Sequence, residues 1–305
     1  MAVARALAAA AVLAAVRALL VRSVPAPLPG TAVLPEDEPE LVALVAEVRA
    51  RLGVSTPVLL RATPDVEAGL VVARLRGRRV ALLLLGVPLL RRLPALELAA
   101  VVAHELGHRG AAVGRGTALL LQARDRLAAS ASPRIGLRGR TAASLLAATR
   151  VRAWHAELAA DRLAAHALGA GALRAALEST STLAVAFSPA REATGEGSRG
   201  GPAAGGDPYS RLDAALDDPE RHRLLRRRAR AADRAPADAL SGHPPVRDRL
   251  RACSDTAGAP GWPPGWLLEI DAHRPVPLRT LPRLTAAATL TLREDARARG
   301  GGHEA

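Results

Sequence analysis

The sequence predicts a mainly α-helical protein that contains one small antiparallel β-sheet. The chain has 305 residues, of which 49% are hydrophobic, so it can bury a full core in one medium domain with appendages. Three short runs of β-type residues lie close together at Pro57–Arg61, Ala68–Leu75 and Arg79–Leu85, and a turn around Gly77 joins the last two. Most of the remaining chain is helical in its pattern, so helices are expected to be the main component.

The order of these elements predicts four regions. Residues 1–24 form a membrane anchor or signal-like segment, and residues 25–56 form a Pro-rich linker followed by a packing helix. Residues 57–254 form the main domain. Within it, residues 188–208 are rich in Gly, Ser, Ala and Pro, which predicts a mobile loop. Residues 255–305 form a C-terminal extension that is expected to be partly disordered.

Three interpretations of the N-terminal segment stay open. Its uncharged run, Ala6 to Val16, is shorter than the ~20 apolar residues that span a bilayer, although Arg17 lies near one end and could snorkel. The segment is therefore a membrane anchor, a signal peptide or an Ala-rich soluble helix, and the anchor is preferred. Arg17 and Arg22 beyond the run favour a cytoplasmic position for the catalytic domain; a soluble or secreted protein is the alternative.

The composition excludes several function classes. The net charge is +13, but every basic side chain is Arg, which indicates a coding bias more than a binding strategy. No nucleic-acid-binding motif or aromatic stacking platform accompanies the charge, so nucleic acid is not an expected partner. Cys253 is the single cysteine, which excludes an internal disulfide and a Cys-rich metal site. Any metal ion must be held by histidines and carboxylates.

The strongest chemical motif lies in Leu93–Gly110. A helix there places His104 and His108 four residues apart on one face, so both rings can reach one zinc ion, while Glu105 points to the adjacent side. The small aliphatic run Ala99–Ala103 before the motif predicts a buried helix. The competing interpretation is a chance HExxH on a surface helix, which this apolar run disfavours.

A second helix supplies candidate partners for these histidines. A catalytic zinc needs three protein ligands and one open position for water. In the helical stretch Thr141–Leu168, Glu157 and Asp161 fall on one otherwise apolar face. Glu157 is the best candidate for the third ligand, and Asp161 is placed to accept the spare ring N–H of His104. The alternative is that the two acids pair with nearby arginines.

This arrangement predicts a zinc-dependent endopeptidase that holds one zinc ion and acts on peptide or protein substrates. Glu105 is expected to take a proton from water activated by the metal and to pass it to the leaving amine. A non-cleaving regulatory or binding protein on the same fold is the alternative. Such a protein would be expected to have lost Glu105 or the third ligand, and the sequence retains both.

The motifs HELGH, ELAAD and SGHPP, the last followed by an Arg/Leu helix, together resemble the HtpX-like and CAAX-prenyl-protease-type zinc metallopeptidases. These form metallopeptidase family 48 of the gluzincin group, and the resemblance runs from about Pro57 to Arg251. It implies a zincin-like (gluzincin) fold with one zinc ion held by His104, His108 and Glu157.

The resemblance also implies roles for three further residues. Glu105 is the catalytic acid/base, Asp161 orients a ligand, and His243 hydrogen-bonds the oxyanion in the transition state; a turn histidine with a structural partner is the alternative for His243. Family members commonly carry several membrane helices, whereas the apolar stretches at residues 117–122 and 144–148 are too short to span. The chain is therefore expected to carry at most one membrane helix, at its N-terminus.

Overall fold

The structure is a computed structural model that describes residues 28–75, 78–108, 120–121, 124, 127, 136–196, 207–234, 242–253 and 270–300. The chain divides into two compact units. The first comprises Met1–Leu28, Gly114–His155 and Asp238–His243, and the second comprises Pro29–Val113, Ala156–Ala237 and Pro244–Ala305. The expected N-terminal membrane helix lies outside the described residues. Among the helices that are described, none is long and apolar enough to cross a membrane.

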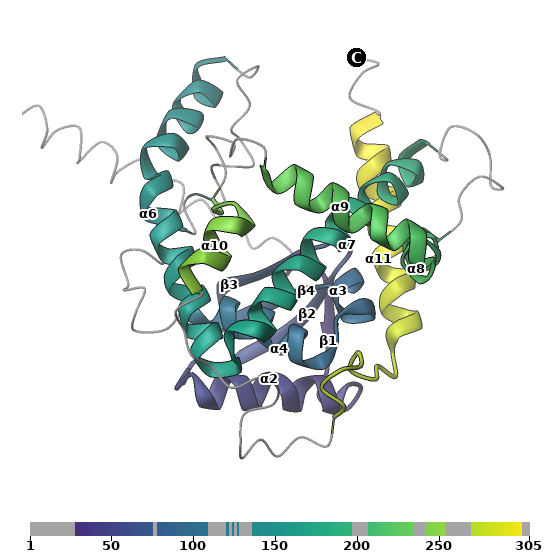
Figure 1. Cartoon of the computed structure of the whole chain (residues 1–305), viewed down its shortest axis with the longest axis horizontal. Helices are drawn as coiled ribbons and strands as arrows, with labels where there is room; N and C mark the ends of the chain where they lie inside the picture. Colours follow the sequence, from purple (N-terminus) through teal and green to yellow (C-terminus); the bar gives the residue numbers. More distant parts are fainter. Residues whose placement is uncertain are drawn as a thin grey trace, which may run out of the picture. The chain divides into compact units, whose positions relative to one another are not determined.

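Helices form most of the described chain, as predicted (Figure 1). They are α2 (Pro39–Arg51), α3 (Val87–Arg92), α4 (Ala95–Gly107), α6 (Gly136–Leu168), α7 (Ala170–Glu196), α8 (Pro208–Asp217), α9 (Pro219–Arg234), α10 (Val246–Cys253) and α11 (Leu281–Gly300).

The sheet has four strands and is mixed, so the prediction of an antiparallel sheet was wrong. The strands β1 (Thr31–Val33), β2 (Val58–Thr63), β3 (Ala68–Leu75) and β4 (Arg78–Gly86) lie in the order β1-β2-β4-β3. The outer pairs are antiparallel, but β2 and β4 run parallel. The apolar run of β4 is buried nearly throughout, which is typical of a central strand. Strand β4 therefore lies between β2 and β3 in the sheet.

Helix α2, which follows β1 in the chain, and the HELGH helix form much of the core of the second unit. The predicted packing helix is α2, and its buried residues recur with helical spacing at Leu41, Leu44, Val45 and Val48. Helix α4 is buried along almost its whole length, including four alanines that are fully inaccessible. Alanine side chains let neighbouring helices approach closely, and α4 packs against α2 and α7. The HELGH motif therefore lies on a helix that is buried along almost its whole length.

Helix α7 extends further than the sequence predicts. The expected mobile loop at residues 188–208 is helical up to Glu196, with Pro189 inside the helix, and residues 197–206 lie outside the described part. Tertiary packing explains the difference: Phe187 stacks on Tyr209 of α8 with ring centroids 5.3 Å apart, and Thr194, two residues before the helix ends, is buried. This packing outweighs the loop-like composition of the segment.

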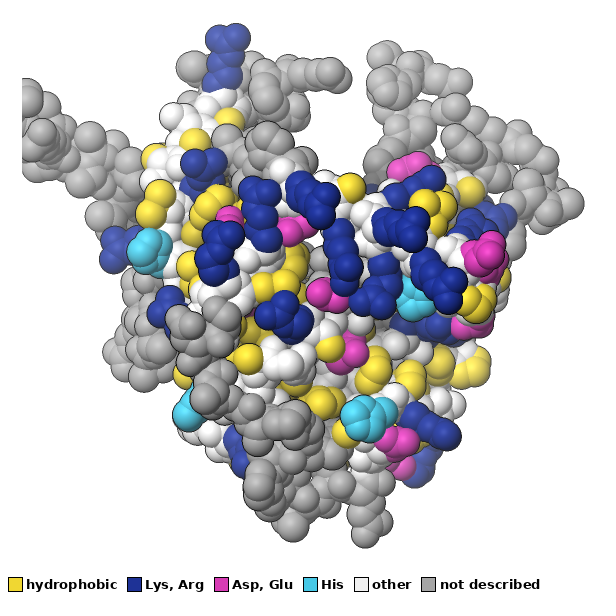
Figure 2. Space-filling model, viewed as in Figure 1, with side chains coloured by type: hydrophobic (Ala, Val, Ile, Leu, Met, Phe, Trp, Pro, Cys, Tyr) yellow, Lys and Arg dark blue, Asp and Glu magenta, His cyan; other side chains and the backbone are white. Residues whose placement is uncertain are grey.

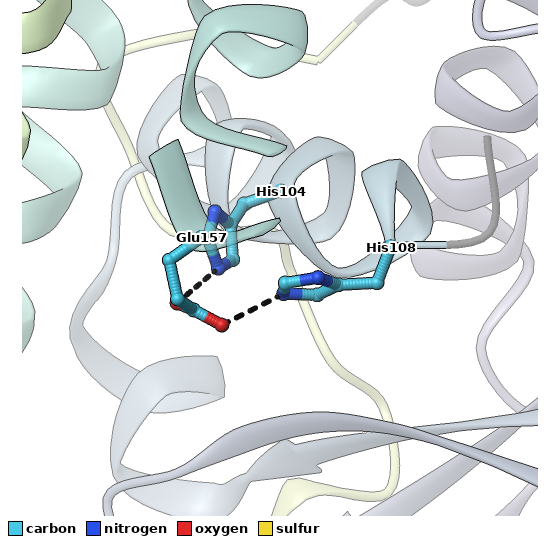
Figure 3. A group of neighbouring side chains, drawn as sticks. All are labelled: His104, His108 and Glu157. Atoms are coloured by element: carbon cyan, nitrogen blue, oxygen red, sulfur yellow. Dashed lines mark ion pairs between the residues drawn. The ribbon is translucent and has the colours of Figure 1, made fainter. Parts of the chain in front are cut away.

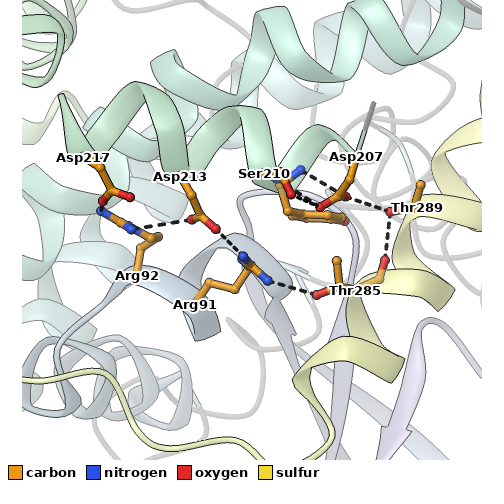
Figure 4. A network of polar contacts seen from close by, with 9 residues as sticks. Arg91, Arg92, Asp207, Ser210, Asp213, Asp217, Thr285 and Thr289 are labelled. Carbon is orange, nitrogen blue, oxygen red and sulfur yellow. Dashed lines mark hydrogen bonds and ion pairs between the residues drawn. The ribbon is translucent and has the colours of Figure 1, made fainter. Parts of the chain in front are cut away.

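A polar network ties α3 to α8 and α11 (Figure 4). Arg91 pairs with Asp213 of α8 and donates a hydrogen bond of 3.3 Å to Thr285 of α11. Arg92 donates to Asp217 at 2.8 Å. In the C-terminal extension, residues 281–300 therefore form an ordered helix that is held by the second unit.

In the first unit, the described residues centre on the N-terminal part of α6. Arg124 is buried and donates hydrogen bonds to the Leu146 carbonyl and the Thr149 hydroxyl. The predicted helix at residues 141–168 is confirmed as part of α6.

Candidate metal centre

Two histidines and a glutamate from separate helices meet at one point of the second unit (Figure 3). His104 and His108 come from α4, and Glu157 comes from α6. Glu157 Oε2 is 3.4 Å from His104 Nε2, and Glu157 Oε1 is 3.3 Å from His108 Nε2. One ligand atom from each residue lies within 4.8 Å of the others. The structure thus brings together the three residues that the sequence singled out as ligands.

Close packing between α4 and α6 positions this cluster. Gly107, inside the HELGH motif, lies so near α6 that a Cβ atom there would be 3.2 Å from Ala160 Cα. Ala160 lies in the ELAAD segment between Glu157 and Asp161, so the two motifs touch through their smallest residues. The backbones can approach because neither position carries a large side chain.

Asp161 links the cluster to a third helix. It is fully buried and its Oδ1 lies 2.8 Å from His104 Nδ1. Arg249 of α10 donates two hydrogen bonds to the same carboxylate, from Nη2 at 2.7 Å and from Nε at 2.8 Å. The expected contact between Asp161 and His104 is therefore present. Because Asp161 accepts at Nδ1, the other ring nitrogen, Nε2, is directed to Glu157.

The charges in this buried group are strongly coupled. Burial raises the pKa of Asp161, but hydrogen bonds from Arg249 and His104 outweigh that effect and lower it to about 2. Burial and Arg249 lower the pKa of His104, whereas its hydrogen bonds to Asp161 and Glu157 raise it to about 10. The Asp161 carboxylate is thus ionised and favours a positive charge at the imidazole. A proton or a metal ion can supply that charge.

The donor set fits zinc. Two imidazole nitrogens and one carboxylate oxygen are ligands of catalytic zinc sites. In a tetrahedral site with metal–ligand distances near 2.0–2.1 Å, ligand atoms lie about 3.3 Å apart. Glu157 approaches each histidine at 3.3–3.4 Å through a different carboxylate oxygen, and both distances are longer than a typical ionic hydrogen bond. With one ligand atom from each residue, the three atoms lie within 4.8 Å of one another, so the three residues can reach one ion.

Comparison with known proteins identifies the family. Residues 35–257 match the profile of Peptidase family M48. The chain belongs to this family. No curated protein and no solved structure matches the chain. M48 metallopeptidases use zinc, which agrees with the His-His-Glu cluster. The family match does not extend to the HtpX-like specifics of the resemblance.

Two further residues of the M48 chain were expected to act on substrate. Glu105 is 9% exposed and lies on α4 directly after His104. His243 is exposed and lies three residues before Val246, where α10 begins. It belongs to the first compact unit, whereas the metal cluster belongs to the second. The oxyanion role of His243 therefore stays a prediction.

Arg249 is a site residue of this M48 peptidase that the sequence reasoning missed. Burial lowers its pKa, but hydrogen bonding to Asp161 and the nearby charges of Asp161, Glu157 and Glu105 together raise it. Its position in the Arg/Leu helix after SGHPP was the available signal. Helix α10 has an arginine at every second position, 247, 249 and 251. Only the docking of the helix determines that the middle one, Arg249, reaches Asp161.

Proposed function

We propose that this chain is a zinc-dependent endopeptidase that cleaves peptide bonds in peptide or protein substrates. The observation that carries the proposal is the His104–His108–Glu157 cluster, with Glu105 beside it on α4, in a chain of a zinc metallopeptidase family.

In the proposed reaction, Glu105 moves the proton. His104, His108 and Glu157 would hold a zinc ion, which would supply a Lewis acid that lowers the pKa of water to about 7 and polarises the substrate carbonyl. Glu105 accepts a proton as water attacks the carbonyl carbon, and it donates that proton to the amine nitrogen as the C–N bond breaks. The products are one new carboxyl terminus and one new amine terminus.

Two neighbouring residues orient the His104 ring. Asp161 accepts the Nδ1 proton of His104 and thereby keeps Nε2 as the coordinating nitrogen. Arg249 fixes the Asp161 carboxylate through two donors, which prevents its rotation. His243 is proposed to hydrogen-bond the oxyanion.

An extended substrate fits the edge of the sheet. In the strand order β1-β2-β4-β3, β3 is the last strand, and among the described residues only β4 pairs with it. Helix α4 packs next to β3. An extended peptide that adds to β3 would form backbone hydrogen bonds that do not depend on sequence, which suits an endopeptidase. A sheet that only supports α4 is the alternative.

The decisive experiment compares Glu105→Gln with the wild type on an unfolded protein such as casein. Glu105 is not a ligand in this mechanism, so the variant should keep one zinc ion per chain while its rate falls by about 10²–10⁴-fold. Zinc is measured by elemental analysis and cleavage by the release of new amines. His104→Ala serves as the comparison and should lose both zinc and activity.

Two results would end the proposal. Cleavage by Glu105→Gln at the wild-type rate would exclude Glu105 as the proton carrier. A wild type that holds one zinc ion yet cleaves no protein substrate would favour the non-cleaving alternative.

A further inference from the structure

A groove of about 260 Å³ lies between α7, α9 and α10. Its charged lining consists of four arginines and two acids, namely Arg226, Arg230, Arg234, Arg247, Glu178 and Asp233. Figure 2 shows arginine side chains gathered over α9, a helix with seven arginines and only two buried residues. The groove is the recessed part of this basic surface, and its floor includes the apolar side chains of Ala229, Val246 and Leu250.

Both acids of the groove are already engaged. Glu178 Oε2 accepts from Arg226 at 3.2 Å and from Arg230 at 3.4 Å, so one carboxylate is shared by two guanidinium groups. Asp233 accepts the backbone N–H of Val246 and of Arg247 at the start of α10. The Arg226 and Arg230 side chains remain 50% and 62% exposed. Each guanidinium has five donors, so the groove keeps donors for an additional anion.

The groove lies one helix away from the metal centre. Helix α10 presents Val246, Arg247 and Leu250 to the groove, and the same helix sends Arg249 to Asp161 and His104. An α-helix with its side chains is about 10 Å wide, and an extended peptide covers about 3.3 Å per residue. A substrate chain that runs from the cluster across α10 would therefore reach the groove roughly three to five residues from the cleaved bond.

We propose that the groove is a substrate subsite that binds acidic side chains, so that the peptidase prefers peptides with Asp or Glu three to five residues from the cleaved bond. This inference rests on the endopeptidase function proposed above. The four arginines against two engaged acids give the groove a net positive charge, and carboxylates are the groups that guanidinium binds with matched geometry. The apolar floor accommodates the methylene groups of the bound side chains.

A peptide fits this surface better than an anionic membrane. A membrane surface is broad, and it would engage protruding arginines all around α9. This site is instead a recess that Arg226 and Arg230 line. A recess of this volume admits single side chains of an extended chain. Membrane binding is an outcome of the test below.

The test uses pairs of fluorogenic peptides with one cleavable core. In one member an Asp/Glu triplet lies three to five residues from the core, upstream or downstream, and in the other Gln and Asn replace it. At low ionic strength, kcat/KM of the wild type should be about tenfold higher for the acidic member on at least one side. The preference should fall strongly at 1 M salt, where the screening length is about 3 Å.

Variants assign the preference to the groove. Arg226→Gln/Arg230→Gln should lose the acidic preference, so that its kcat/KM for the acidic peptide falls to its own value for the neutral peptide. Glu178→Gln removes the carboxylate that competes for the same two arginines, so its preference should exceed that of the wild type. Arg221→Gln/Arg228→Gln makes the same charge change on α9 outside the groove and should keep the wild-type preference.

The failure of this inference is distinguishable from the failure of the proposed function. If the wild type cleaves neither peptide, the peptidase proposal fails. If it cleaves both equally, or if the control pair Arg221/Arg228 lowers the preference as much as the groove pair does, the subsite is wrong. Equal retention of both double variants on phosphatidylserine vesicles, below that of the wild type and without any peptide preference, would overturn it in favour of a membrane surface.

Discussion

Gly107 of α4 packs directly against Ala160 of α6, where the two helices that carry the candidate metal ligands approach each other. A Cβ atom on Gly107 would lie 3.2 Å from Ala160 Cα and 3.3 Å from Ala160 Cβ. His108 follows Gly107 directly, and Glu157 is three residues before Ala160. A change of a few tenths of an ångström between these backbones therefore moves ligands on both helices apart.

We expect Gly107→Ala to weaken zinc binding by about tenfold, as a shift of ligand-supporting groups does. Its free energy of unfolding without metal should change by less than about 1 kcal/mol, because the gain in helix propensity offsets the crowding at Ala160. A competition titration against a chromogenic chelator measures the first quantity, and urea unfolding measures the second.

Gly171→Ala is the matched control. Gly171 lies near the start of α7, and a Cβ atom there would meet nothing within 4 Å. This variant should keep the wild-type zinc affinity. If Gly107→Ala also keeps it, the contact with Ala160 does not set the ligand spacing.

Arg249→Gln should destabilise the protein by about 3 kcal/mol or more, because it leaves the fully buried Asp161 carboxylate without its bidentate cation. Adding Asp161→Asn should recover part of this loss, since the neutral amide needs no cation. Arg251→Gln is the control: its side chain is 79% exposed, and the change should cost less than about 0.5 kcal/mol. Urea unfolding of the wild type, Arg249→Gln, Asp161→Asn and the double variant gives the coupling energy; strictly additive losses would contradict it.

The parts of the fold that could be predicted from sequence are those with a strong local period. Alternating and continuous apolar runs predicted β2, β3 and β4, and helical spacing predicted α2 and α6. The three residues of β1 lie close to a Pro-rich segment and become a strand only through pairing with β2, so no local pattern marks them. The parallel pairing of β2 with β4 likewise depends on tertiary placement.

The same division holds for the site. His104 and His108 share a helix, so their spacing alone predicted their proximity. Glu157 was recognisable because a carboxylate on an apolar helix face requires a partner. Arg249 was not recognisable from the sequence, because the helix that carries it has other arginines. Its contact with Asp161 also spans 88 residues of sequence. A contact of that kind follows from the docking of helices, which sequence periodicity does not encode.

Cys253 should react slowly with thiol reagents in the folded protein. Burial, and then the charge of Asp161, raise the pKa of this thiol from 9.0 to about 11. The folded state thus favours the neutral thiol. The corresponding stability is present below pH 9 and is lost as the pH rises toward 11. Alkylation by iodoacetamide at pH 8 should be about 100-fold slower in buffer than in urea; equal rates would show an exposed, unshifted thiol.

Glu157 and Glu105 should separate metal binding from proton transfer. Glu157→Gln replaces a charged ligand oxygen by a neutral amide, so the variant should hold well below one zinc ion per chain and lose activity. Glu105→Gln makes the identical change next to His104 and should keep the zinc ion. Elemental analysis after dialysis compares the two variants with the wild type.

Removal and return of the metal complete this comparison. A chelator should abolish cleavage by the wild type, and added zinc should restore it, because the cluster, spaced at 3.3 and 3.4 Å, is held by the packing of α4 and α6 rather than by the ion alone. Added zinc at concentrations far above the wild-type dissociation constant should partly restore cleavage by Glu157→Gln, because two histidine ligands remain in that variant. The same addition should not restore cleavage by Glu105→Gln. If Glu157→Gln binds zinc as tightly as the wild type, the third ligand is another residue, and the His-His-Glu assignment is wrong.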